Sequence, residues 1–329
     1  MPQLSLFDEP HRDRRAPDDV AARLAAEHAH AARLAAALPP SVYFGTSSWA
    51  FPGWAGLVYA STAKQASLAR EGLREYARHP LLRTVGIDRS YYAPIPVEDL
   101  RRYAAQLPEG FPCCAKAPAT VASPAAPGSR GVGPPSWNPD FLDAGRFVDE
   151  VLEPWSVAFR NHRGPFIVEI APLPRGLDLA PTDFVDRLDR FLGRLPREFE
   201  YAVELRDSRL LTPDYGRVLR VHGASHTFNY WSAMPMPGEQ AVLVPEDTAS
   251  FVVVRLLLRP GTRYEQQREA FRPFNRLVAP DERMRHDVVG IITRAVPRRR
   301  VYVLVNNKAE GSAPLTIRAL AERVAAAPA

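Results

Sequence analysis

The feature that most constrains the fold is an alternation of short apolar runs with longer helical patterns. Apolar, β-branched or aromatic runs predict eight strands at 42–45, 84–88, 111–116, 166–170, 201–205, 225–229, 251–256 and 301–305. Patterns with the 3.6-residue period of amphipathic helices occupy 68–78, 97–107, 141–159, 182–192, 214–222 and 313–325. Strands that alternate with helices are typical of parallel sheets. Eight such units predict an α/β fold, a TIM-like (β/α)8 parallel barrel.

An open doubly wound sheet is the alternative architecture, but no glycine-rich phosphate turn follows the first predicted strand. With 329 residues, the chain is long enough for one barrel, which we assign to 41–329. An alanine-rich stretch from Asp19 to Leu38 predicts an extra N-terminal helix within 19–40, which Pro39 and Pro40 end. Residues 1–18 are charged and contain prolines, so we expect a flexible tail.

Composition restricts the cellular setting. No uncharged apolar stretch reaches the roughly 18 residues of a membrane span, and the first ten residues lack the pattern of a secretion signal. The adjacent Cys113 and Cys114 would point to opposite sides of a strand, which indicates free thiols and a reducing cytoplasm. The 42 Lys and Arg against 37 Asp and Glu give a net charge of +5, a mild bias toward polyanionic partners.

Functional side chains of a parallel barrel gather where its strands end. We expect three of these side chains to be catalytic: Glu204, Lys116 and Arg206. Eleven others are expected to bind substrate: Thr46, Ser47, Trp49, Trp54, Asp88, Tyr92, Glu169, Asn229, Arg255, Asn306 and Asn307. Such a ring suits a polar, anionic ligand. The alternative is that ion pairs, such as Glu204 with Arg206 or Arg255, only fill a polar layer of the barrel.

No cofactor is predicted. Glu169, Glu204 and His226 could hold a divalent ion such as manganese or zinc, but a lone strand histidine is more often only hydrogen-bonded. The run Arg298–Arg300 precedes the last strand and is therefore expected at the opposite face, as a solvated turn or a phosphate contact. The Pro/Gly/Ser-rich stretch 117–139 predicts a long loop, either a lid or an insertion without a role.

Four segments together resemble the YecE-like family, known as domain of unknown function 72. They are GTSSWAFPGW (45–54), TVGIDRSYY (84–92), AVELRD (202–207) and VYVLVNNKAEGSA (301–313). The resemblance extends from about Val42 to Val324 and implies a TIM barrel. It also implies a polar mouth formed by Thr46, Ser47, Trp49, Trp54, Tyr92, Lys116, Glu204, Arg206, Asn306 and Asn307.

Three positions depart from the family pattern. Gly86 stands where the family usually has Glu, and Glu169 stands where it usually has Gln. Arg255 is followed by Leu256, Leu257 and Leu258 instead of a segment containing His and Gly. If the family's Glu and His take part in chemistry, this chain would bind its ligand without turnover or react differently.

The tail carries a separate motif. Gln3, Leu4, Ser5, Leu6 and Phe7 resemble the Gln-Leu-(Ser/Asp)-Leu-Phe peptide by which bacterial replication and repair proteins bind the DNA polymerase sliding clamp. Leu6 and Phe7 would fill an apolar pocket, and few buried anchors suffice for binding. The sequence therefore predicts the clamp, and DNA or another anionic ligand, as partners.

The first hypothesis is a clamp-tethered, DNA-associated barrel of replication or repair, a nuclease-like hydrolase acting on a phosphodiester or a damaged nucleotide. Lys116, Arg206 and Arg255 would hold phosphate and Glu204 would be the acid/base. A base would stack on Trp49, Trp54 or Tyr92. One alternative is a barrel enzyme acting on a small sugar-phosphate-like metabolite; another is a non-catalytic adaptor.

Overall fold

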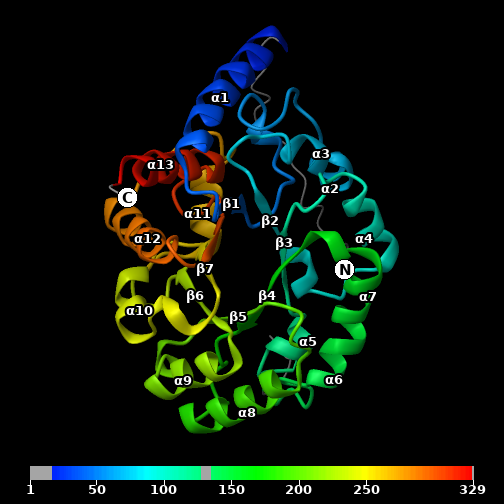
Figure 1. Cartoon of the computed structure of the whole chain (residues 1–329), viewed down its shortest axis with the longest axis vertical. Helices are drawn as coiled ribbons and strands as arrows, with labels where there is room; N and C mark the ends of the chain where they lie inside the picture. The colour runs from blue at the N-terminus through cyan, green and yellow to red at the C-terminus, as the bar shows by residue number, and fades with distance from the viewer. Residues whose placement is uncertain (1–16, 127–134, 328–329) are drawn as a thin grey trace, which may run out of the picture.

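Eight parallel strands close into one barrel in chain order, with helices around the outside (Figure 1). The structure is a computed structural model that describes residues 17–126 and 135–327. The strands are β1 (Val42–Thr46), β2 (Thr84–Ile87), β3 (Cys113–Lys116), β4 (Arg163–Ile170), β5 (Tyr201–Leu205), β6 (Ser225–Tyr230), β7 (Phe251–Leu256) and β8 (Arg300–Val305). Strand β8 pairs with β1 and completes the closure. The predicted (β/α)8 barrel is confirmed.

The α-helices are α1 (Pro17–Ala37), α2 (Gln65–Glu71), α3 (Leu73–Tyr76), α4 (Val97–Ala104), α5 (Ala119–Ala122), α6 (Ala144–Phe147), α7 (Glu153–Ala158), α8 (Pro181–Arg194), α9 (Pro213–His222), α10 (Pro237–Leu243), α11 (Tyr264–Phe271), α12 (Glu282–Ala295) and α13 (Ala313–Ala326). Short turns are η1 (Pro52–Trp54), η2 (Asp88–Tyr91), η3 (Val148–Leu152), η4 (Arg160–His162), η5 (Ser208–Leu210) and η6 (Glu246–Thr248). The extra N-terminal helix is present as α1. It begins at Pro17, slightly earlier than predicted.

Two predicted helices are divided in the structure. The pattern at 68–78 corresponds to α2 and α3, which Gly72 separates, and 141–159 is split by the π-helical turn η3. Four helices of the described part had no predicted counterpart: α5, α10, α11 and α12. Helix α5 lies within the stretch 117–139, which was predicted to be a loop. The first three are short, but α12 buries Met284, Val288 and Ile291 with helical spacing, so its signal is present in the sequence.

Two apolar layers hold the fold together. Cys113 packs in the larger core with the surrounding helices, whereas Cys114 lies in a second cluster with Ile167, Val253 and Tyr302. The prediction that the two cysteines face opposite sides is therefore confirmed, and both are free. Burial raises the pKa of both thiols, that of Cys114 to about 12, so both stay protonated at neutral pH.

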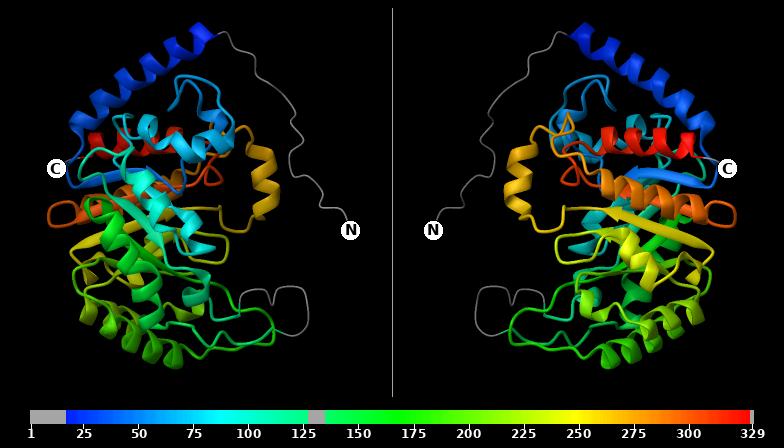
Figure 2. Two further views of the ribbon diagram at one scale, coloured as in Figure 1. Left: turned by 90° about the vertical axis from the view of Figure 1, so that its right-hand side faces the viewer. Right: turned by 90° about the vertical axis from the view of Figure 1, so that its left-hand side faces the viewer.

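The parallel strands give the barrel two chemically distinct ends. Figure 2 shows α11 standing off the end toward which the strand arrows point, the carboxyl-terminal mouth. Helix α1 packs beside α13, where Glu27 accepts a 2.7 Å hydrogen bond from Arg318. Within the described residues, no helix has the length and apolar character needed to cross a membrane. The tail residues 1–16 and the loop centre 127–134 lie outside the described part.

Candidate functional site

Six charged side chains meet at the carboxyl-terminal mouth, and we call them the mouth cluster. They are Asp88, Lys116, Glu169, Glu204, Arg206 and Arg255, which lie in or directly after β2, β3, β4, β5 and β7. Glu169 and Glu204 are partners in the β4–β5 register, which places both carboxylates at the same height in the barrel. All six were predicted as site residues from the sequence, and the structure brings these six together.

Arg255 forms the base of the mouth cluster, with its side chain fully buried. One terminal nitrogen lies 2.9 Å from both carboxylate oxygens of Asp88, and the other lies 2.5 Å from Glu204 Oε2 and 3.4 Å from Glu169 Oε2. Burial alone would lower the pKa of Arg255, but these three carboxylates outweigh it and raise the pKa above its ordinary value. Arg255 therefore stays charged and links β7 to residues in or directly after β2, β4 and β5 across the interior of the barrel.

Glu169 lies at the centre of the cluster. Its Oε2 lies 2.8 Å from both Lys116 Nζ and Arg206 Nη2. Burial raises the pKa of Glu169, but Arg206, Lys116 and Arg255 outweigh burial and hold that pKa well below its ordinary value. Each of the three basic side chains of the cluster contacts at least two of its three acidic side chains.

The cluster has a buried layer and a more accessible one. Glu204 is fully buried between Arg206 and Arg255, each 2.5 Å from one of its oxygens. The side chain of Asp88 is 26% exposed, and Lys116 lies 3.5 Å from it and 2.8 Å from Glu169. Asp88 is therefore the carboxylate of the cluster that a ligand reaches most easily. The acid/base role of Glu204 stays a prediction.

The β1 side of the mouth is built from buried side chains. Trp49 donates to the carbonyl of Leu68 at 2.8 Å, and Trp54 donates to Asn307 Oδ1 at 3.2 Å; these indoles are 4% and 0% exposed. Neither indole offers an open face to a ligand, which corrects the expectation that they stack on one. Of the rings predicted for stacking, only Tyr92, 84% exposed, is accessible.

The remaining predicted residues fix the strand ends. Thr46 Oγ1 donates to the carbonyl of Ser48 at 2.7 Å, and Asn229 Nδ2 donates to the carbonyl of Leu205 at 2.7 Å. Asn306 Oδ1 accepts from the backbone of Lys308 at 3.1 Å. These contacts shape the loops that carry the site.

Several buried polar atoms near the mouth have no hydrogen-bond partner within the described part of the chain. They are Ser47 Oγ, Arg206 Nε, Asn229 Oδ1, Arg255 Nε and Asn307 Nδ2. Buried polar groups of folded proteins nearly always have a partner, which can be solvent or a ligand. All five atoms belong to residues predicted for the site, so this end of the barrel is suited to a polar ligand.

Sequence reasoning did not assign Lys308, although it stands directly after Asn307 in the last motif. Lys308 is 8% exposed, and its Nζ lies 4.4 Å from the centroid of the Tyr264 ring. Burial, helped by the nearby Arg268 and Lys116, lowers the pKa of Lys308 to about 8, although Asp88 and Glu265 act in the opposite direction. The contact depends on α11, a helix that the sequence did not predict.

A further aromatic contact that sequence reasoning missed lies beside the cluster. The Arg206 guanidinium lies 4.0 Å from the centroid of the Trp231 ring, which follows β6. Stacking on an indole orients the flat guanidinium and shields one of its faces from water. Arg206 is therefore held from one side by Trp231 and from another by Glu169 and Glu204.

The metal hypothesis depended on His226. Its Nδ1 lies 2.9 Å from Tyr215 Oη and its Nε2 lies 3.1 Å from Gln240 Oε1, and burial lowers its pKa to about 4. Both ring nitrogens of His226 therefore have hydrogen-bond partners within the described part of the chain. Across residues 17–126 and 135–327, no group of three or more His, Cys, Asp or Glu side chains is arranged to hold a metal ion.

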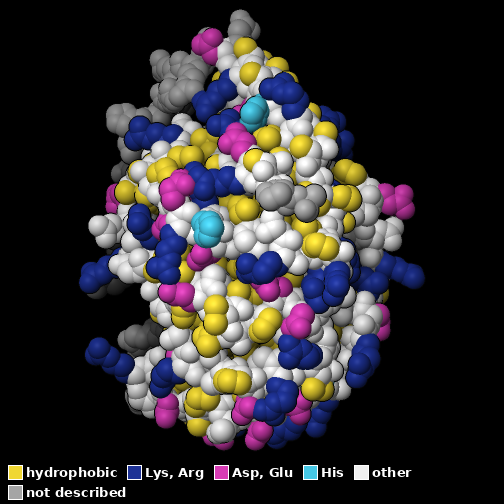
Figure 3. Space-filling view, turned by 60° about the vertical axis from the view of Figure 1, so that its left-hand side comes forward, with side chains coloured by type: hydrophobic (Ala, Val, Ile, Leu, Met, Phe, Trp, Pro, Cys, Tyr) yellow, Lys and Arg dark blue, Asp and Glu magenta, His cyan; other side chains and the backbone are white. Residues whose placement is uncertain are grey.

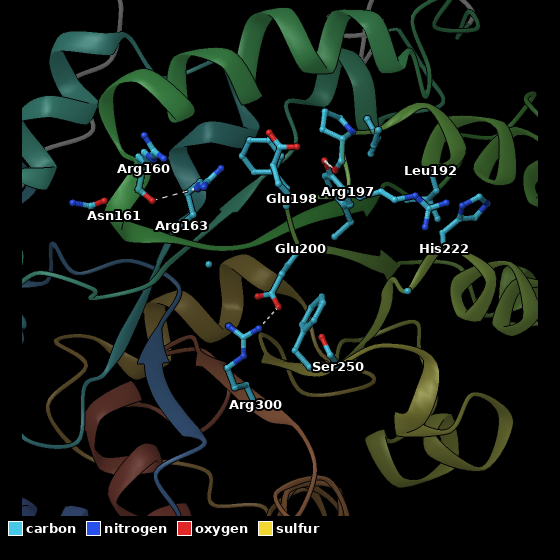
Figure 4. A pocket seen from close by; sticks show the side chains of 17 residues that line it. Arg160, Asn161, Arg163, Leu192, Arg197, Glu198, Glu200, His222, Ser250 and Arg300 are labelled. Atoms are coloured by element: carbon cyan, nitrogen blue, oxygen red, sulfur yellow. Dashed lines mark hydrogen bonds and ion pairs between the residues drawn. The ribbon is translucent and has the colours of Figure 1, made fainter.

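A cavity of about 570 Å³ lies at the opposite end of the barrel, where β4 and β8 begin. Figure 4 shows Arg160, Arg163, Arg197, Glu198 and His222 around it, and Arg300 directed toward Glu200. The placement predicted for Arg298–Arg300 is confirmed, since Arg300 begins β8 at this end. No predicted site residue lines this cavity.

Comparisons with known proteins identify the family. The family described as "Protein of unknown function DUF72" matches residues 43–329. A crystal structure of a DUF72 family protein from Enterococcus faecalis is similar with a TM-score of 0.61 and 16% identity, covering 88% of this chain and 96% of that one. One from Thermotoga maritima gives 0.60 and 17%, covering 86% and 98%. A search of curated proteins gives no significant match. The chain therefore belongs to the DUF72 family, as its four motifs indicated.

Proposed function

We propose that this protein is a DNA-associated barrel of replication or repair, tethered to the polymerase sliding clamp by Gln3–Phe7, whose mouth cluster binds the phosphate of its ligand. The location rests on the tail peptide, which lies outside the described residues. The binding site rests on one observation above all: five buried polar atoms without a hydrogen-bond partner in the described part belong to predicted site residues at the carboxyl-terminal strand ends.

The charge of the mouth favours an anion. The three cations and three carboxylates of the mouth cluster balance, and Lys308 adds one positive charge when it is protonated. Lys116, whose side chain is 11% exposed, is the most accessible cation of the cluster. It is therefore the cation best placed to replace a contact with a carboxylate oxygen by a contact with a phosphate oxygen. Because the site is largely desolvated, each such contact is stronger than it would be in water.

The same groups would support hydrolysis of a phosphodiester. Asp88 would accept the proton of an attacking water, because it is the exposed carboxylate of the cluster. Lys116 and Arg206 would stabilise the charge that develops on the phosphate oxygens. Tyr92 would stack on an adjacent base. This assigns the general base to Asp88, with Glu204 holding the two arginines beneath it.

Tethering would compensate for a modest intrinsic affinity for DNA. On the side of the molecule in Figure 3, Lys and Arg side chains stand among Asp and Glu rather than forming one basic stripe. Nonspecific DNA affinity depends on such basic stripes. A clamp-binding peptide would raise the local DNA concentration without any new contact by the barrel.

A small anionic metabolite such as a sugar phosphate is the second candidate, because the cations of the mouth are buried. Lys116 is 8% exposed and Arg206 is 5% exposed, so a compact ligand would reach them more easily than a duplex. In this case the tail peptide would be incidental. A non-catalytic adaptor, which the departures at Gly86 and after Arg255 favour, would bind the clamp and DNA without turnover.

The first test measures the tether. A fluorescent peptide of residues 1–12 is titrated with the sliding clamp of the same organism, beside a Leu6→Ala/Phe7→Ala peptide. We expect micromolar or tighter binding that the double substitution abolishes. The absence of binding by the unsubstituted peptide would remove the reason for placing the protein at DNA.

The second test measures the site. Full-length protein is tested for salt-dependent DNA binding and, by thermal shift, for stabilisation by sugar phosphates. Lys116→Ala should weaken whichever ligand binds, whereas the exposed Lys64→Ala should not. If the two substitutions change ligand binding equally, the ligand does not bind at the carboxyl-terminal mouth.

A further inference from the structure

Lysine is rare in this chain, and its distribution is uneven. Only three of the 42 Lys and Arg residues are lysines: Lys64, Lys116 and Lys308. Lys64 is exposed just before α2, whereas Lys116 and Lys308 are each 8% exposed and lie at the carboxyl-terminal mouth. Arginine stays protonated, but a lysine can lose its proton and become a nucleophile. The mouth therefore holds both buried lysines of a chain whose other basic side chains, apart from Lys64, are arginines.

The two buried lysines have different surroundings. Lys116 is paired with Glu169 at 2.8 Å and with Asp88 at 3.5 Å. Lys308 forms no ion pair with any Asp or Glu of the described part, and its ammonium lies over the Tyr264 ring at 4.4 Å. Burial lowers its pKa to about 8, so part of the amine is neutral near pH 7.5. Lys116 is suited to hold an anion, and Lys308 is suited to react.

We propose that Lys308 is a nucleophilic amine that forms an imine with an aldehyde or ketone carbonyl of a phosphate-bearing ligand. The inference deepens the proposed function and rests on it in one respect, because the mouth cluster must hold the ligand's phosphate. Lys116 ends β3 and Lys308 follows β8, so both amines lie at the carboxyl-terminal mouth of the barrel. Helix α11, which carries Tyr264, covers the amine at the same end of the barrel (Figure 2).

The chemistry balances without an oxidant or reductant. The lone pair of neutral Nζ attacks the carbonyl carbon and the C–N bond forms; the nitrogen then loses one proton and the carbonyl oxygen takes up one proton, which gives a carbinolamine. A second proton converts the hydroxyl into water, which leaves as the protonated imine forms. Asp88, whose side chain is 26% exposed, is the most accessible carboxylate of the mouth cluster and would accept and return these protons.

Two sources could supply such a carbonyl. One is the open-chain sugar of an abasic site in DNA, which has phosphates on both sides. Its imine acidifies the C2′ hydrogen; after a base removes that proton, the C3′–O bond breaks and its electron pair leaves with the 3′ phosphate. The other source is a small phosphorylated aldose or ketose. Both sources present the same reactive carbonyl group. The experiment therefore tests a probe of each kind separately.

The test is reductive trapping on the full-length protein. A duplex with one abasic site, and separately glyceraldehyde 3-phosphate, are incubated with the protein and sodium cyanoborohydride, and the adduct is located by peptide mass mapping. We expect at least tenfold more adduct on Lys308 than on Lys64 with one of these probes. Trapping should rise with pH toward an apparent pKa of about 8.

Matched variants distinguish reaction from binding. Lys308→Arg keeps the charge and should lose the adduct while retaining probe binding, whereas Lys116→Ala should weaken probe binding itself. Lys64→Arg should change neither, and unfolding curves check that each variant is folded. If an adduct forms on Lys308 with the sugar phosphate but not with the abasic duplex, Lys308 is supported as the nucleophile and the DNA part of the proposed function is rejected.

Two results would overturn the inference. One is probe binding that depends on Lys116 without any adduct on Lys308, a result that leaves the proposed function standing. The other is labelling of Lys64 and Lys308 at equal rates, because an exposed lysine then reacts as well as the buried one. If neither probe binds nor reacts, both the imine and the phosphate site are rejected for these two carbonyl sources.

Discussion

The two ends of the barrel use the same residue types in opposite ways. At the carboxyl-terminal mouth, Arg255 and Glu204 are fully buried, and each cation of the cluster contacts at least two carboxylates. At the amino-terminal cavity, Arg300 is 47% exposed and its carboxylate contact is Glu200. Burial, rather than the number of charges, therefore separates the end where ion pairs fix the structure from the end where they cover a surface.

The contrast extends to the carboxylates themselves. At the mouth, burial raises the pKa of Glu169, but Arg206, Lys116 and Arg255 outweigh it, so that pKa is lowered. At the cavity, burial raises the pKa of Glu200, and its contact with Arg300 does not offset this. Folding therefore favours the charged form of Glu169 and the neutral form of Glu200.

The largest expected effect comes from removing the cation beneath the mouth. Arg255→Leu leaves Asp88, Glu169 and Glu204 close together without their shared partner. Breaking a buried ion pair from one side costs about 3–5 kcal/mol. We expect a loss of this size in the free energy of unfolding measured with urea. The exposed Arg217→Ala on α9 is the control. A loss below about 1 kcal/mol for Arg255→Leu would contradict the mouth network.

Much of this contrast follows from the sequence. The alternation of strands and helices predicts the barrel, and in a parallel barrel the residues after each strand must share one end. Asp88, Lys116, Glu169 and Arg206 come from separate strands, yet this rule alone predicts that they meet. Arg300, at the start of a strand, is assigned to the other end by the same rule.

Side-chain burial does not follow from that rule. Trp49 and Trp54 stand in a loop after β1, where indoles could stack on a ligand, but the chain folds back and buries them against Leu68 and Asn307. The setting of Lys308 depends on Tyr264, a residue of the short helix α11. Strand patterns predict which residues reach the mouth, but tertiary packing decides which of them a ligand can touch.

A steric pair of substitutions tests whether packing differs between the ends. A Cβ on Gly86 in β2 would lie 3.1 Å from the Cα of Ser47, and a Cβ on Gly164 in β4 would lie 3.0 Å from the carbonyl oxygen of Cys113. Extra methyl groups in tight sites cost about 1–3 kcal/mol. We expect Gly86→Ala and Gly164→Ala to lower the unfolding free energy similarly. A much larger loss at one position would show that packing also distinguishes the ends.

The pH dependence of stability should differ in sign between the two carboxylates. The pKa of Glu169 is lowered on folding, so its contribution is complete above its unfolded pKa and is lost as the pH falls toward the folded value. The pKa of Glu200 is raised, so its contribution is present at low pH and is lost as the pH rises through its unfolded and folded values.

Unfolding of Glu169→Gln and Glu200→Gln between pH 3 and 6 measures both effects. Glu169→Gln should flatten the rise of stability with pH, and Glu200→Gln should steepen it, by at most about 1.4 kcal/mol per pH unit for each group. Wild-type protein and the exposed Glu98→Gln serve as references. Slopes that change in the same direction would contradict the proposed difference between the two ends.

The smallest effect is expected at the cavity. Arg300→Ala removes the contacts with Glu200 and with Tyr302 Oη at 3.3 Å, but the arginine is 47% exposed. Exposed ion pairs contribute about 0–1 kcal/mol, and salt weakens them because the Debye length falls to about 3 Å at 1 M. Urea unfolding should therefore show a small loss that 1 M sodium chloride removes, while the loss caused by Arg255→Leu persists because water and ions do not reach the buried cluster. If instead the two substitutions lower the free energy of unfolding equally and respond alike to salt, burial does not distinguish the ion pairs at the two ends. The mouth would then differ from the cavity only in the ligand that it binds.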